Sequence, residues 1–222
     1  MRDNPSTSRA SSPPPRQGGV IAWLLGGLLI CAALATLAWM LLLPGLVQSR
    51  FSAASGGAQL SLQGLMGDPF AGRASVTGWQ LRASAATDAP VLAEGKTSRL
   101  LASDWQRALE ARAGSTVVLD AAELHVTRLV LAPDAAGKWP LLALAAAAGL
   151  PYERHGPVGA ESPRVRVKNL LLRVDAVVVR DARTGRDQAV RIDWRGEYRD
   201  LDHTRPVVAA LLAAVAARTA TP

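Results

Sequence analysis

Apolar residues are arranged in two different ways along the chain. The first arrangement is a run from Gly19 to Leu43 that holds no charged residue. As a helix, these roughly 25 residues reach about 37 Å, which exceeds the roughly 30 Å hydrocarbon core of a bilayer. The run therefore predicts one membrane-spanning helix over residues 18–46, with Trp23 and Trp39 as anchors at the two membrane surfaces.

The charges before this run predict its orientation. The tail of residues 1–17 carries more arginines than acids, so the positive-inside rule keeps the N-terminus in the cytoplasm. Its Ser and Pro content predicts disorder. A cleaved signal peptide is the alternative, but its apolar region should span only about 7 to 15 residues. We then expect a linker over 47–57 and an extracytoplasmic domain over 58–222.

The second arrangement, beyond residue 58, has a period of two, which is typical of strands with one buried face. In three segments the alternation slips by one residue and leaves the same pattern, apolar-x-x-apolar-x-apolar: Val76–Leu81, Val126–Leu131 and Val167–Leu172. Such a slip indicates a bulge that bends the strand, with chance recurrence in an Ala-, Leu- and Val-rich sequence as the alternative. We expect a curved sheet with bends near residues 78, 128 and 169.

These bends would turn the apolar side chains toward a common hollow. The residues expected to line this groove are Leu60, Leu62, Val76, Trp79, Leu81, Val126, Leu129, Leu131, Val167, Leu170 and Leu172. Short helices are predicted over 105–112, 138–150 and 206–218, and 165–181 with 188–194 predicts a hairpin. The expected fold class is one N-terminal transmembrane helix, then a β-rich α+β domain with a mainly antiparallel, bent sheet and two or three short packing helices.

The chain is basic, with a formal net charge of +7 and an isoelectric point near 10.6. Nearly all the cations are arginines that alternate with apolar residues in predicted strands, which is typical of a solvated strand face and argues against nucleic-acid binding. Between Arg173 and Asp202 they are interleaved with aspartates, which predicts ion pairs between strands, with an anion or glycan site as the weaker alternative. The single cysteine, Cys31, excludes an intramolecular disulfide.

No residue pattern points to catalysis. His125, His155 and His203 each stand alone, without a second ligand at metal-binding spacing. The sequence contains neither a Gly-x-Ser-x-Gly elbow nor a glycine-rich phosphate loop. We therefore expect a protein that is not an enzyme, with no catalytic residues, no metal and no cofactor.

The stretch Leu60–Leu81, LSLQGLMGDPFAGRASVTGWQL, resembles the opening of AsmA-like proteins. The shared features are a strand, a Gly-x-Pro-Phe-x-Gly connection and a second strand that ends in gly-apolar-x-apolar. Segments 122–131, 138–142 and 165–194 resemble later parts of that family. The resemblance implies a repeating β-groove of the bridge-like lipid-transfer kind, whose apolar concave face shields acyl chains. Family members are usually several times longer, and the groove expected here is under about 40 Å at about 4.8 Å per strand.

The same resemblance implies a place and partners for the protein. The place is the bacterial inner membrane, with the C-terminal domain in the periplasm and a role in envelope lipid handling or outer-membrane biogenesis. The implied partners are the lipids of that membrane, and another groove protein or envelope subunit joined by edge-strand pairing. No nucleic acid is expected.

Two functions from different classes follow from these patterns. A lipid-handling module predicts that the apolar phase of the strands lines an open trough. A non-catalytic scaffold or secretion-accessory subunit, which acts through protein–protein contacts, predicts instead that the short helices cover the apolar face completely.

Overall fold

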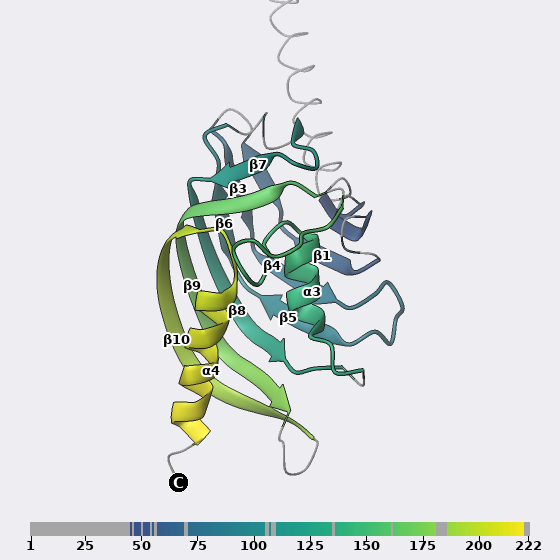
Figure 1. Ribbon diagram of the computed structural model, residues 1–222, viewed down its shortest axis with the longest axis vertical. Helices are drawn as coiled ribbons and strands as arrows, with labels where there is room; N and C mark the ends of the chain where they lie inside the picture. Colours follow the sequence, from purple (N-terminus) through teal and green to yellow (C-terminus); the bar gives the residue numbers. More distant parts are fainter. Residues whose placement is uncertain are drawn as a thin grey trace, which may run out of the picture. The chain divides into compact units, whose positions relative to one another are not determined.

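Ten strands form one sheet in the computed structural model, and most of the strand pairs are antiparallel (Figure 1). The structure describes residues 45–219 except 46, 50, 54, 56, 69–70, 105–106, 108–109, 135, 161 and 181–185. The elements are β1 (Gln59–Gln63), β2 (Met66–Asp68), β3 (Arg73–Val76), β4 (Gly78–Arg82), β5 (Val91–Gly95), β6 (Ser98–Leu101), β7 (Thr116–Leu119), β8 (Ala121–Leu131), α3 (Pro140–Ala147), β9 (Arg164–Arg180), β10 (Asp187–Leu201) and α4 (Arg205–Thr219).

The short strands join end to end into longer ribbons. β1 pairs with β4 while β2 pairs with β3, and β3 pairs with β6 while β4 pairs with β5. The sheet therefore contains four interrupted ribbons, each made of two consecutive strands: β1/β2, β3/β4, β5/β6 and β7/β8. The strands β9 and β10 complete the sheet. Neighbouring ribbons in the sheet are also neighbours in the sequence. Only β9 runs parallel to its neighbours β7 and β8. The long connection that contains α3 permits this parallel return.

The interruptions of the first three ribbons lie opposite one another, so the sheet bends along one line. The Thr77 backbone N–H and hydroxyl both donate to the Gln63 carbonyl oxygen, at 3.0 and 3.1 Å, across the first two interruptions. In the next ribbon the Lys96 N–H donates to the His125 carbonyl at 2.9 Å. On β8, Thr127 is the extra residue of a register shift opposite β5. These irregularities lie near the predicted bends at 78 and 128.

The third predicted bend, near residue 169, is visible in the burial pattern. Val167 and Leu170 are both buried although they are three residues apart, so the buried face shifts phase between them. The pairing of β9 with β10 continues through this point, and Asp200 on β10 adopts a positive φ of 52° beside it. A second irregularity of β10 lies at Asp193, with φ 44°, between Arg191 and Trp194.

One face of the sheet, called here the inner face, carries apolar rows that cross every ribbon. One row contains Leu60, Leu81, Ala93, Leu129, Val177 and Val190, and the next contains Leu62, Trp79, Gly95, Val126, Val174 and Trp194. Both helices lie on one side of the sheet (Figure 1). Leu211 and Val215 of α4 join the main core, and Leu144 of α3 packs with Leu92.

The predicted fold class requires correction. In the part of the chain that the structure describes, no helix is both long and apolar enough to cross a membrane. The predicted tail 1–17, the anchors Trp23 and Trp39 and nearly all of the predicted span 18–46 lie outside the described residues. Within the predicted linker 47–57, Val47–Ser49 and Phe51–Ala53 are helical.

Some of the other predicted elements agree with the structure and others do not. The helices expected over 138–150 and 206–218 are α3 and α4, and the hairpin is β9 with β10, although β10 continues to Leu201. Most of the predicted helix 105–112 lies outside the described residues. The strands β5 and β6 and the parallel pairing of β9 were not predicted, because the alternation in this sequence is broken at the bend and carries no signal of strand direction.

Candidate functional site

The residues predicted to line a lipid groove belong to the inner face, where much of the surface is closed. Buried members are Val126, Leu131, Val167, Leu170 and Leu172, and partly buried members are Leu60, Leu62, Val76, Trp79, Leu81 and Leu129. The buried members belong to the core that α4 covers with Leu211, which is only 1% exposed. The inner face is therefore packed over much of β8, β9 and β10, and it is more accessible on its β1–β5 side.

The side chain of Trp79 is packed tightly on the inner face, as a core residue is. Its indole Nε1–H donates to the Ser98 hydroxyl at 2.9 Å, and that serine is 5% exposed. The ring lies over Gly95 on the neighbouring ribbon, where a Cβ atom would overlap both the ring and the His125 carbonyl oxygen. A buried indole N–H needs such a partner. Trp79 is thus fixed by the fold on this face.

An open groove of about 940 Å³ crosses all six ribbons of the sheet, and the burial of its middle residues assigns it to the outer face, which is the face opposite the inner face. Three consecutive residues from each ribbon line it, and the middle ones, such as Ala74, Ala122 and Leu170, are buried in the core. Because side chains alternate along a strand, the flanking residues form two walls on the outer face. One wall is Met66, Ser75, Arg99, Glu123, Leu171 and Glu197; the other is Asp68, Arg73, Leu101, Ala121, Asn169 and Arg199.

The groove combines apolar and charged side chains. Leu101, Ala121 and Leu171 are half-buried on three adjacent ribbons, and Met66 at one end is 54% exposed. Arginines and acids stand on the same walls, and Arg99 pairs with Glu123 at 3.7 Å while both remain largely exposed. Across six ribbons spaced about 4.8 Å apart the groove is roughly 24 Å long. It can hold an extended ligand that has both an apolar and a charged part.

Hydrogen bonds beneath one wall fix the backbone where β7 meets β8. The Asn169 amide donates to the Asp120 carbonyl oxygen at 3.1 Å, and the Lys168 ammonium donates to the Asp120 carboxylate at 2.6 Å. Hydrogen bonds from Lys168 and from Ser103 hold the pKa of Asp120 far below its usual range. The interruption between β7 and β8 is therefore held by charge-assisted bonds to β9.

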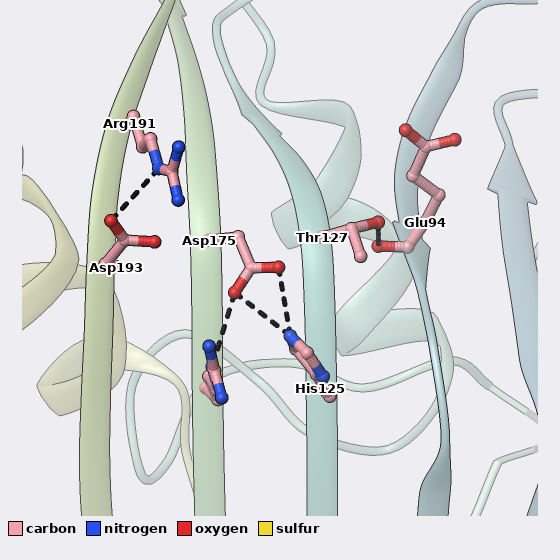
Figure 2. A network of polar contacts seen from close by, with 7 residues as sticks. Glu94, His125, Thr127, Asp175, Arg191 and Asp193 are labelled. Carbon is pink, nitrogen blue, oxygen red and sulfur yellow. Dashed lines mark hydrogen bonds and ion pairs between the residues drawn. The ribbon is translucent and has the colours of Figure 1, made fainter.

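A second, polar depression of about 470 Å³ lies further along the same strands on the outer face. Figure 2 shows the Asp175 carboxylate facing His125, with Nε2 of the imidazole 3.0 Å from both carboxylate oxygens. Burial raises the pKa of Asp175, but the hydrogen bond from His125 and the charges of His125, Arg173 and Lys96 outweigh it, and the net pKa is lowered. Asp175 is therefore an ionised acceptor at neutral pH.

The ion pairs of the outer face differ from the predicted ones in direction. Arg173 with Asp175, Arg191 with Asp193 and Arg195 with Glu197 are pairs within a strand, at 3.4, 3.0 and 3.0 Å. Pairs between strands join Arg166 to Asp200 at 2.8 Å and His125 to Asp175 at 3.0 Å. His203 pairs with its neighbour Asp202 at 2.7 Å, and His155 is exposed.

The outer groove could not be predicted from the sequence, because its walls consist of the mostly polar residues that alternate with the buried residues along each strand. The arginines among these residues, such as Arg99, are expected from the sequence only as part of a solvated strand face. The signal available was the recurrence of an apolar residue among them, at Leu101 and Leu171. To find the site, one must also know how the strands pair, because the pairing brings Leu101 and Leu171 to adjacent parts of one surface.

The fold and the groove define a class: a bent, mostly antiparallel β-sheet with one helix-covered face and one open, amphipathic face. Beyond that class, no protein-family model, no curated protein and no solved structure matches the chain. The AsmA-like resemblance therefore stays a prediction. Among the described residues, no group of three or more His, Cys, Asp or Glu side chains could hold a metal ion.

Proposed function

We propose that this protein is a non-catalytic lipid-handling module that binds a phospholipid-like amphiphile in the outer groove. The observation that carries the proposal is the groove itself, whose volume of about 940 Å³ lies near the upper end of the roughly 300–1,000 Å³ range of small-molecule sites. Half-buried apolar side chains line it beside charged ones, which suits a molecule with an acyl chain and a polar head. The lipid-handling role is the one that the AsmA-like resemblance implies.

The proposed ligand lies across the ribbons. An acyl chain over Leu101, Ala121 and Leu171 would remove their remaining apolar surface from water, worth about 25 cal/mol per Å². The guanidiniums of Arg73 and Arg199, on the same wall as Leu101 and Ala121, add positive charge along the groove, which favours an anionic amphiphile. This proposal moves the lipid from the inner face, where the sequence predicted it, to the outer face. The periplasmic location inferred from the sequence stays a prediction.

The second candidate function is a structural subunit that acts through protein contacts. The closed inner face favours it, since α4 and α3 cover much of the surface that a lipid-filled trough would leave open. The edge strand β1 has no partner on its outer side among the described strands, and a strand of another subunit could pair there.

Photocrosslinking in cells separates these functions. A photoreactive residue replaces Leu171 in the groove or, in a matched variant, Leu129 on the inner face; both side chains are partly buried. We expect phospholipid to be recovered from position 171 and little from position 129. Lipid recovered mainly from 129 would restore the inner-face trough. Protein adducts alone at both positions would reject lipid handling in favour of the structural subunit.

A further inference from the structure

The polar depression and the outer groove are parts of one continuous surface. His125 lies two residues after Glu123 on β8, and Arg173 lies two residues after Leu171 on β9; Glu123 and Leu171 are groove residues. Side chains two residues apart on a strand share a face and are about 7 Å apart. A ligand in the groove can therefore reach the depression without leaving the outer face.

Cations outnumber acids in the depression. Lys96, Arg173 and Arg191 line it with the carboxylates of Asp175 and Asp193. Lys96 forms no ion pair with any carboxylate that the structure describes, although its charge contributes to the lowered pKa of Asp175. The net charge of these groups is positive even with His125 neutral, and it increases if the imidazole is protonated.

The two arginines make contacts that use only part of each guanidinium. Arg173 approaches Asp175 through Nε at 3.4 Å. Arg191 donates from Nε to Asp193 at 3.0 Å (Figure 2). Both side chains are largely exposed, and contacts through Nε leave their terminal Nη groups to other acceptors. These remaining N–H groups offer forked donors to a phosphate.

His125 completes the floor of the depression. Its Nε2 lies 3.0 Å from both carboxylate oxygens of Asp175, and this hydrogen bond partly offsets the negative charge of that residue. The acid therefore repels an incoming anion less than a free carboxylate would. The chemical group that fits the depression is a compact anion with several acceptor oxygens. The rest of the ligand would be an apolar chain that continues from this anion into the groove.

Resting on the lipid-handling function proposed above, we propose that this depression is the headgroup subsite, in which Lys96, Arg173 and Arg191 bind the phosphate of a phospholipid whose acyl chain lies in the outer groove. The ligand class is thus a phosphate monoester or diester that carries an acyl chain. Free inorganic phosphate has the same head chemistry, and the experiment separates the two sources.

The test measures binding to the full chain with three probes: a lysophosphatidate, the monoacylglycerol of the same chain length, and inorganic phosphate. The variant Lys96→Gln/Arg173→Gln removes two exposed cations from the depression. Its matched control, Lys138→Gln/Arg112→Gln, removes two exposed cations elsewhere. We expect lysophosphatidate affinity to fall at least about tenfold in the first variant and to stay within twofold in the control. Monoacylglycerol affinity should change in neither.

Each result decides a different point. If the wild-type chain binds neither acyl probe, the lipid-handling function itself fails. If both acyl probes bind and the depression variant leaves lysophosphatidate affinity unchanged, the function stands and the headgroup subsite is rejected. Inorganic phosphate that binds as tightly as lysophosphatidate would also reject it, because the acyl chain would then contribute nothing.

Discussion

At the scale of single residues, glycines permit aromatic rings to lie flat against the sheet. Trp79 covers Gly95, and the rings of Trp194 and Tyr198, whose centroids are 6.3 Å apart, flank Gly196. Neither glycine has a positive φ, so it is the space above each glycine, and not its backbone conformation, that excludes other residues. Trp194 and Gly196 are close in the sequence, so their contact could be expected from it. Trp79 and Gly95 are far apart in the sequence, and the pairing of β4 with β5 brings them together.

The two glycines should respond differently to alanine. At Gly95 the new Cβ would meet the backbone oxygen of His125 as well as the indole of Trp79, and a backbone atom cannot move away alone. At Gly196 the nearest atoms all belong to aromatic side chains, which can rotate. We expect Gly95→Ala to lower the free energy of unfolding by about 2–3 kcal/mol and Gly196→Ala by about 1 kcal/mol. Urea denaturation measures both, and equal losses would contradict the packing described for Trp79.

Asp175 predicts a pH-dependent contribution to stability. Its pKa is lowered in the folded state, so its stabilising effect is present above the unfolded value near 3.8 and is lost as the pH falls through the folded value. We expect Asp175→Asn to cost about 1 kcal/mol at pH 7. Below about pH 4 the difference from wild type should shrink. Unfolding curves between pH 7 and 3 test this, with the exposed Asp88→Asn as a control that changes little.

At the scale of elements, α4 shows what a sequence pattern leaves open. The segment VVAALLAAVAA has apolar residues on most sides, so its bounds were predictable within one residue but its packing face was not. In the structure Val208, Leu211 and Val215 are buried in the core, and Leu212 is 41% exposed. This packing covers the inner face over β9 and β10, where the predicted groove residues Val167, Leu170 and Leu172 are buried.

Adjacent leucines of α4 provide the matched test. Leu211→Ala removes a side chain that is 1% exposed and should cost about 2–4 kcal/mol, from lost burial and the cavity left behind. Leu212→Ala removes a largely exposed side chain and should change stability by less than about 1 kcal/mol. Chemical denaturation gives both values. Similar small losses would mean that α4 does not seal the inner face in solution.

At the scale of the whole molecule, the period of two predicts a sheet with one apolar face, and the strand pairing places apolar rows such as Leu60 to Val190 across a mostly antiparallel sheet. Which face stays open could not be predicted, because it depends on where α3 and α4 dock. The outer groove could not be predicted either. Its walls are assembled from single residues of every ribbon, and one of those ribbons, β9, joins by a parallel pairing that local pattern does not encode.

The open groove predicts that a bound amphiphile stabilises the sheet, because the ligand bridges several adjacent ribbons. A ligand that binds only the folded state at 100 times its dissociation constant adds about 2.7 kcal/mol, which for a domain of this size raises the melting temperature by roughly 5–10 °C. Leu171→Asp places a charge on the apolar part of the groove wall and should abolish the shift, whereas Leu171→Met keeps an apolar surface and should preserve it. Thermal unfolding of the full chain with and without lysophosphatidate measures the effect. A shift that survives in Leu171→Asp would place the ligand elsewhere, since a carboxylate cannot be buried beneath an acyl chain without a partner.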